Sequence, residues 1–101
     1  MKKILLICDM GMSTSLVVKR MKEAAESKGI EVVIEAKGSQ EFKSVVNDFD
    51  VILLAPQISY KLAEFKVIAD EREKPIDLIN MMAYGMTDGD KILSQAFELI
   101  A

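Results

Sequence analysis

The chain has 101 residues, half of them hydrophobic, and a formal net charge of −3 at pH 7. A chain of this length forms one domain with its own core, and its scattered basic residues argue against nucleic acid or an anionic membrane surface as a partner. With no histidine and only one cysteine, the sequence excludes an internal disulfide and its own phosphohistidine, predicts neither metal nor cofactor, and favours a reducing cytoplasm.

Apolar strand-like runs alternate with helical patterns along the chain, which is typical of βαβ units and a parallel sheet. Strands are expected at about 3–8, 31–36, 50–55 and 76–79. Helices are expected at about 13–28, 39–48, 58–71 and 88–100, each with apolar residues at the spacing of one helix face. In the first helix this stripe consists of Val17, Met21 and Ala24, flanked by Leu16 and Ala25.

The order of the strands follows from their patterns. The first and third, Ile4–Ile7 and Val51–Ala55, are continuous apolar runs, as expected of strands buried on both faces. Glu31 and Glu35 alternate with apolar residues in the second strand, and Asp77 interrupts the fourth, so these two are predicted at the edges. Right-handed crossovers then give the order 2-1-3-4 in a single three-layer α/β domain.

The most informative segment follows the first strand. Cys8 ends that strand, and a short loop leads from it into the first helix. Backbone N–H groups and the positive end of a helix dipole converge in such a loop, which suits an anion and makes a thiol a better nucleophile. The predicted phosphate-binding loop contains Asp9, Met10, Gly11, Met12, Ser13, Thr14 and Ser15. Helix capping is the alternative role for its three hydroxyl groups, and burial as a small hydrophobe is the alternative for Cys8.

Other residues are predicted at the same edge of the sheet. Adjacent central strands whose helices leave on opposite faces form the switch point where such sheets bind ligands. Pro56-Gln57 follows the third strand there, and Gln57 either hydrogen-bonds near the site or caps the next helix. Tyr84 is expected at the rim. Five methionines are predicted in loops at this edge, where they contact partners or fill gaps beneath the loops: Met10, Met12, Met81, Met82 and Met86.

The loop differs from that of cysteine phosphatases. The sixth position after the cysteine is Thr14 where those enzymes have an arginine, and the nearest arginine is Arg20, well along the helix. Without a guanidinium clamp and an acid, hydrolysis loses electrostatic and proton-transfer help. A loop of this kind accepts a phosphoryl group and keeps it, as a carrier must. A small cysteine-dependent phosphatase is the alternative, followed by a module that binds phosphate reversibly.

Over essentially the whole chain, 1–101, the sequence resembles the IIB component of the lactose/cellobiose (chitobiose) family of bacterial phosphoenolpyruvate-dependent sugar phosphotransferase systems. The resemblance rests on Cys8, the loop Gly11–Ser15, Pro56-Gln57-Ile58, Tyr84-Gly85 and Asp88-Gly89. It implies a four-stranded parallel sheet related to small tyrosine phosphatases.

The resemblance also implies a mechanism. Cys8 would accept a phosphoryl group from a phosphohistidine of a IIA protein and pass it to a sugar, a β-glucoside or related disaccharide, held by the membrane permease IIC. Two positions depart from the family pattern. Asp9 stands where a small or neutral residue is common, and we expect its carboxylate to point away from the phosphate. Ala55 stands where glycine is common before Pro-Gln.

Overall fold

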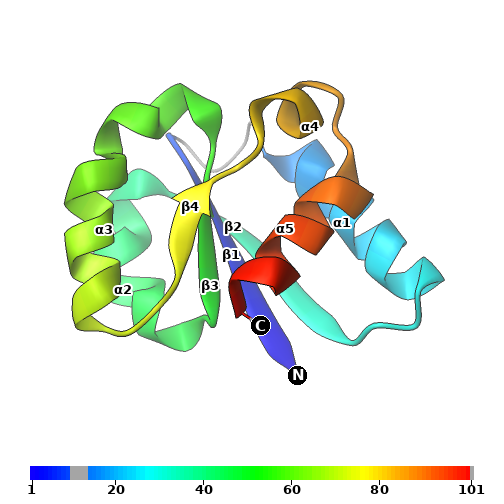
Figure 1. The fold of residues 1–101 in the computed structure, drawn as a ribbon, viewed down its shortest axis with the longest axis horizontal. Helices are drawn as coiled ribbons and strands as arrows, with labels where there is room; N and C mark the ends of the chain where they lie inside the picture. The colour runs from blue at the N-terminus through cyan, green and yellow to red at the C-terminus, as the bar shows by residue number, and fades with distance from the viewer. Residues whose placement is uncertain (10–13, 101) are drawn as a thin grey trace.

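The computed structural model describes residues 1–9 and 14–100. Its four strands are β1 (Lys2–Cys8), β2 (Val32–Gly38), β3 (Val51–Leu54) and β4 (Ile76–Leu78). They form one parallel sheet in the order β2-β1-β3-β4, with β1 between β2 and β3 (Figure 1). The predicted strand order, including both edge strands, is therefore confirmed.

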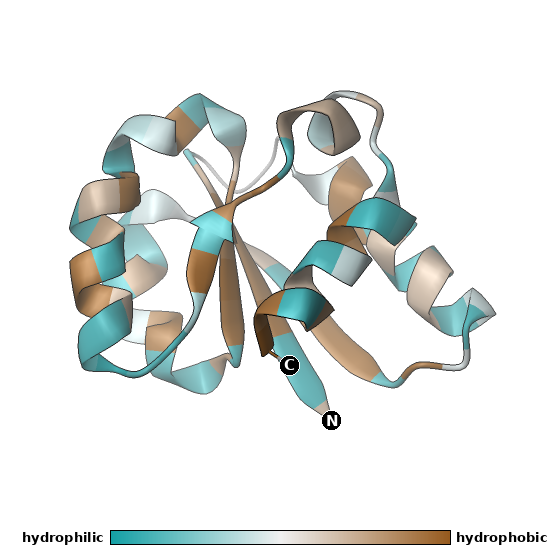
Figure 2. Cartoon of the chain, viewed as in Figure 1, coloured by the Kyte–Doolittle hydropathy of each residue, from teal (hydrophilic) through white to brown (hydrophobic). Residues whose placement is uncertain are grey.

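Helices cover both faces of the sheet. On one face lie α1 (Ser15–Ser27) and α5 (Gly89–Ile100), and on the other α2 (Phe42–Val45) and α3 (Leu62–Glu71) (Figure 1). Strand β1 supplies both hydrophobic cores, because neighbouring strand residues point to opposite faces. Ile4 and Leu6 join the core under α1 and α5, whereas Leu5 and Ile7 join the core under α2 and α3. Figure 2 shows the apolar residues gathered in the central strands.

Three predicted helical segments differ in detail from the structure. The segment expected at 39–48 is broken into the 3-10 helix Ser39–Glu41, the single turn α2 and the 3-10 helix Val46–Asp48. The segment expected at 58–71 begins as the 3-10 helix Pro56–Lys61 before α3. In the first helix Val17, Met21 and Ala25 are buried, but Leu16 is 46% exposed. Leu16 therefore flanks the stripe on its solvent side, and Ala24, which was expected within the stripe, is only half-buried while Ala25 takes its place in the core.

A short helix was not predicted at all. Met81, Met82 and Met86 were expected in loops, but Met81 and Met82 lie in the helix α4 (Met81–Gly85), and only Met86 lies in the turn after it. Asn80 caps it, since the Asn80 Oδ1 accepts a hydrogen bond of 3.0 Å from the backbone N–H of Ala83. Thus α4 lies between β4 and α5, at the end of the sheet to which the carboxyl ends of the strands point (Figure 1).

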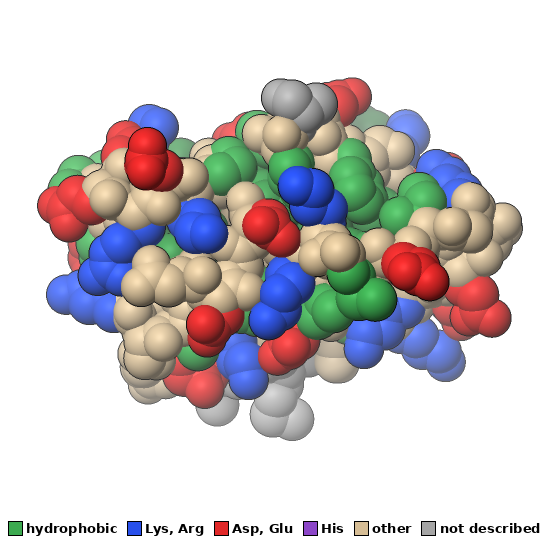
Figure 3. All heavy atoms as spheres, turned by 90° about the horizontal axis from the view of Figure 1, so that it is seen from below, with side chains coloured by type: hydrophobic (Ala, Val, Ile, Leu, Met, Phe, Trp, Pro, Cys, Tyr) green, Lys and Arg blue, Asp and Glu red, His purple; other side chains and the backbone are tan. Residues whose placement is uncertain are grey.

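The opposite end of the molecule, where the N-terminus lies, carries acidic and basic side chains side by side, with apolar groups between them (Figure 3). Among the residues that the structure describes, no helix is both long enough and apolar enough to cross a membrane.

Gly89 sets how closely α5 packs on α1. It is buried at the start of α5, and a Cβ placed on it would lie 2.3 Å from the carbonyl carbon of Arg20. Those atoms are backbone and cannot rotate away, so any side chain would push the two helices apart. This steric contact explains why glycine occupies the second position of the Asp88-Gly89 motif.

We predict that Gly89→Ala lowers the free energy of unfolding by about 2 kcal/mol or more, because the added methyl group overpacks the contact between α1 and α5. Gly85→Ala is the matched control. Gly85 is exposed, its Cβ would meet nothing within 4 Å, and alanine favours a helix. Urea denaturation of both variants makes the comparison, and equal stabilities would contradict the close contact.

Candidate active site

Cys8 lies at the carboxyl end of β1 and is buried, with a relative exposure of 0%. The hydroxyl group of Thr14 donates a hydrogen bond to its Sγ across 3.6 Å. Thr14 directly precedes α1, so this bond holds the thiol at the N-terminal end of a helix of 13 residues. Both the hydroxyl and the helix dipole stabilise negative charge on sulfur. The predicted placement of Cys8 beside a helix N-terminus is confirmed.

The hydroxyl of Thr14 does not cap the helix, although the residue occupies the cap position. Among the described residues its side chain accepts no hydrogen bond from the first turn of α1. Instead it is fully buried and turned to the cysteine sulfur. The capping alternative is therefore wrong for Thr14. Ser15 is exposed and faces a shallow groove with Ile34 and Ala36, so its predicted contact with phosphate stays a prediction.

The remainder of the predicted loop is only partly described. Asp9 follows Cys8 and is exposed, which agrees with a carboxylate that faces solvent. Four predicted loop residues lie outside the described residues: Met10, Gly11, Met12 and Ser13.

The third strand ends beside the first. The backbone N–H of Ala55 donates to the carbonyl of Ile7, the residue before Cys8, across 2.8 Å. Two residues later the side-chain Nε2 of Gln57 donates to the hydroxyl of Tyr84 across 3.3 Å. Thus the structure brings together two predicted rim residues that are 27 positions apart in the sequence. In this geometry Gln57 reaches α4 instead of capping the helix that follows it.

The exposed methionines form a surface that we call the methionine face. Met81, Met82 and Met86 are 75%, 72% and 70% exposed, on α4 and the residue after it. These three side chains do not fill gaps beneath loops, so that alternative is wrong for them. The sequence signal that could have located α4 is Asn80, a preferred helix cap, directly before the methionine pair.

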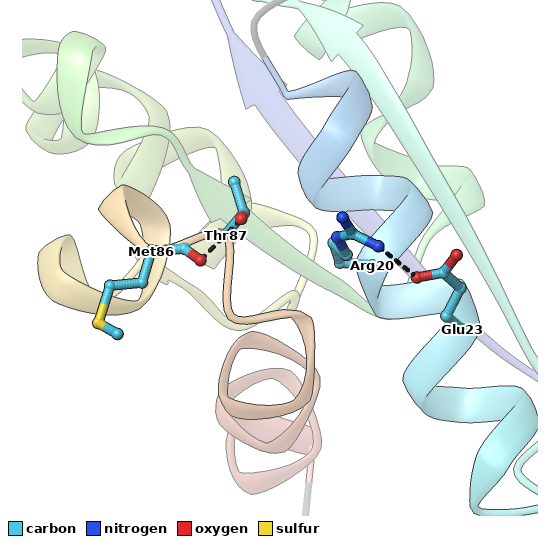
Figure 4. A network of polar contacts seen from close by, with 4 residues as sticks. All are labelled: Arg20, Glu23, Met86 and Thr87. Carbon is cyan, nitrogen blue, oxygen red and sulfur yellow. Dashed lines mark hydrogen bonds and ion pairs between the residues drawn. The ribbon is translucent and has the colours of Figure 1, made fainter.

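The nearest arginine in the sequence is engaged elsewhere. Arg20 pairs through Nη1 with Glu23 Oε1 at 3.0 Å on the outer surface of α1 (Figure 4).

In the same view the connection from α4 to α5 passes through Thr87, whose φ of 48° is strained for a β-branched residue. Its hydroxyl donates to the carbonyl of Met86 across 2.7 Å.

The buried thiol thus lies at a helix N-terminus and at the switch point of a small parallel sheet, the place where sheets of this class bind ligands and where an anion is stabilised. The fold is shared with a low molecular weight protein tyrosine phosphatase from Bacillus subtilis, with a TM-score of 0.58 at 13% identity over 97% of this chain and 96% of that one.

Sequence comparison gives the family. The family described as "PTS system, Lactose/Cellobiose specific IIB subunit" matches residues 3–95, and the chain belongs to it. Components of this kind act as phosphotransferases in sugar phosphotransferase systems, transferring phosphate to the sugar. The expected family and fold class are thereby confirmed.

Individual relatives cover nearly the whole chain. It is 46% identical to the oligo-beta-mannoside-specific EIIB component of Bacillus subtilis, over 99% of this chain and 97% of the relative. It superposes on the cellobiose-specific phosphotransferase IIB component from Borrelia burgdorferi with a TM-score of 0.83 at 39% identity, over 98% of this chain and 91% of that one.

We predict that Thr14→Val lowers the thiolate fraction of Cys8 roughly fivefold at a pH below its titration midpoint, because a hydrogen bond worth about 1 kcal/mol is lost. Ultraviolet absorbance measures the thiolate at a pH below the range in which the two tyrosines ionise, and the thiolate signal then comes from the one cysteine. Thr14→Ser keeps the hydroxyl and should restore the fraction. The role of the hydroxyl is refuted if the valine variant, correctly folded, titrates like the wild type.

Proposed function

We propose that Cys8 is the phosphoryl carrier of this IIB component. The observation that carries the proposal is the Thr14 hydroxyl donating to the Cys8 sulfur at the start of α1. This arrangement favours the nucleophilic thiolate, and the same helix end favours the phosphate that would be attached there.

The proposed reaction has two steps. In the first, the Cys8 thiolate attacks the phosphorus of a phosphohistidine on a IIA protein. The S–P bond forms, the P–N bond breaks, and the imidazole leaves and takes up a proton. In the second, a sugar hydroxyl attacks the phosphocysteine. The P–O bond forms, the S–P bond breaks, the hydroxyl proton is released and the thiolate returns.

Two features favour a carrier over a small cysteine-dependent phosphatase. Thr14 occupies the position where a phosphatase loop carries arginine, and it is buried against the sulfur. Arg20 is already paired with Glu23 on the helix surface. The loop sequence, 9–15, contains no arginine or lysine to clamp a phosphate, so we expect a phosphocysteine there to persist until an acceptor arrives.

The partners follow from the family. A IIA protein supplies the phosphohistidine, and the membrane permease IIC holds the sugar. The protein works in the cytoplasm and docks on the permease from that side. The names of the relatives, specific for oligo-beta-mannosides and for cellobiose, support a β-glucoside or related β-linked disaccharide as the acceptor.

The methionine face provides a contact surface next to the rim of the site. Met81, Met82 and Met86 are exposed, and Tyr84, in the same stretch, bonds to Gln57. Flexible, polarizable methionines adapt to more than one partner, as a carrier that meets IIA and IIC in turn requires. We therefore assign partner docking to this face.

We predict that Cys8→Ser folds but accepts no phosphoryl group, because a serine hydroxyl stays protonated where a thiol ionises. Wild type and variant are incubated with phosphoenolpyruvate and the upstream carriers, and the intact mass of each is measured. A variant phosphorylated as fully as the wild type would remove Cys8 from the mechanism. Steady release of phosphate by the wild type from an aryl phosphate would favour the phosphatase instead.

We predict that changing both Met81 and Met82 to lysine raises the KM for this protein as a substrate of phosphorylated IIA about tenfold, because exposed anchor residues dominate docking energies. The control is Val67→Lys, which adds charge at an apolar residue 59% exposed on α3, on the other face of the sheet. Equal KM values for the two variants would show that docking takes place elsewhere.

A further inference from the structure

The outer edge of β4 is closed by a side chain. An edge strand normally presents unpaired N–H and C=O groups to solvent. The inner groups of β4 bond to β3, as when the N–H of Ile79 donates to the carbonyl of Leu54 across 2.8 Å. Because strand residues alternate in direction, the peptide groups of Leu78 and Asn80 point outward, away from β3.

Gln95 of α5 satisfies these outward groups. Its Nε2 donates to the carbonyl of Leu78 across 2.6 Å, and its Oε1 accepts from the N–H of Asn80 across 3.0 Å. One amide that pairs with both groups flanking Ile79 takes the place of the N–H and C=O that one residue of a parallel neighbouring strand would offer. The N–H of Leu78 also has a partner, because it donates to Asp77 Oδ1 across 2.7 Å.

These bonds leave the edge poorly suited to an incoming strand from a partner. An added strand would need the carbonyl of Leu78 and the N–H of Asn80, and Gln95 already pairs with both. A groove lies beside these hydrogen bonds, and its lining includes Pro56, Met81, Lys91 and Glu98. The backbone groups of β4 at this groove are already bonded to Gln95. We therefore consider which residues Gln95 holds in place.

Gln95 fixes the point where β4 turns into α4. Asn80, held through its backbone N–H by Gln95, caps α4 with its side chain on the N–H of Ala83 and with its carbonyl on the N–H of Tyr84, across 3.0 and 2.9 Å. On the other side, Ile79 and Ala83 are buried in the core beneath α1 and α5. The start of α4 is therefore clamped between α5 and the core.

Two further hydrogen bonds connect α4 to the residue before the thiol of Cys8. Tyr84 of α4 accepts from Gln57, which follows Ala55 at the end of β3. The N–H of Ala55 donates to the carbonyl of Ile7, directly before Cys8. A shift of Asn80 would move the methionine face and the bond between Gln57 and Tyr84 together, since α4 has only five residues and no other cap at its start.

We propose that Gln95 is a positioning residue for phosphoryl transfer, which it serves by holding α4 and the methionine face in place beside the site of Cys8. The inference rests on the carrier function proposed above. Gln95 touches no reacting atom. It acts through Asn80, and the substitution that removes its two hydrogen bonds should impair partner docking more than it impairs folding.

The test compares Gln95→Met, which keeps the length of the side chain and removes its amide, with Ser94→Ala at the neighbouring exposed position. Amide hydrogen exchange is followed at Asn80, Ala83 and Tyr84, and kcat and KM are measured with phosphorylated IIA as donor. We expect faster exchange at these three amides in Gln95→Met and a KM raised roughly fivefold or more, because two hydrogen bonds are lost and the loss of one already corresponds to about that factor. Ser94→Ala should match the wild type.

A second variant tests whether Gln95 acts through Asn80. Asn80→Ala removes the cap and should raise KM by a similar factor, and the double variant should show less than the product of the two effects because both act on one path. Unchanged KM in a folded Gln95→Met protein, or multiplicative effects in the double variant, would overturn the inference. If the wild type itself accepts no phosphoryl group, the carrier function fails instead, while the exchange data still report whether Gln95 holds α4.

Discussion

The pairing of β1 with β3 is the interaction on which the rest of the structure depends. All of β3 and residues 4–8 of β1 are buried, and β1 supplies alternate residues to two separate cores. In a parallel pair the carboxyl ends meet at one edge, so Cys8 ends beside the turn at Ala55. The segment after β3 therefore begins beside Cys8, and its Gln57 bonds to Tyr84, which lies 27 residues further along the chain.

The chemistry at this edge depends on which charges are present. Thr14 stabilises the sulfur with a neutral hydroxyl, whereas an arginine there would clamp the phosphate. A phosphate site without a cationic side chain accepts a phosphoryl group from a high-energy donor and holds it less tightly than a site with an arginine does. A carrier must release the group to the next acceptor, so weaker holding together with slow hydrolysis suits it. A phosphatase on the same fold requires the opposite balance.

The sequence predicted the sheet because burial leaves a strong periodic signal. Continuous apolar runs at Ile4–Ile7 and Val51–Ala55 marked the inner strands, and Glu35 and Asp77 marked the edges. The helix α4 was missed because five residues are too few to show a helical period, and its only signal was Asn80. The bond from Thr14 to Cys8 could not be predicted, because capping and sulfur contact are equally open to a threonine before a helix. Likewise, the edge role of Gln95 depends on the packing of α5 against β4, which no local pattern reveals.

The central claim is that a phosphoryl group rests on the sulfur of Cys8. Phosphorus NMR tests it most directly, because S-bound, N-bound and O-bound phosphoryl groups resonate at different positions. After incubation with phosphoenolpyruvate, the upstream carriers and IIA, the account predicts a phosphorothioate ester signal from this protein. When the remaining phosphoenolpyruvate is removed and membranes with IIC and the sugar are added, that signal should disappear as a sugar phosphate signal rises. A signal from an O-linked phosphoryl group on this chain, or an S-linked signal that persists while sugar phosphate accumulates, would contradict the account.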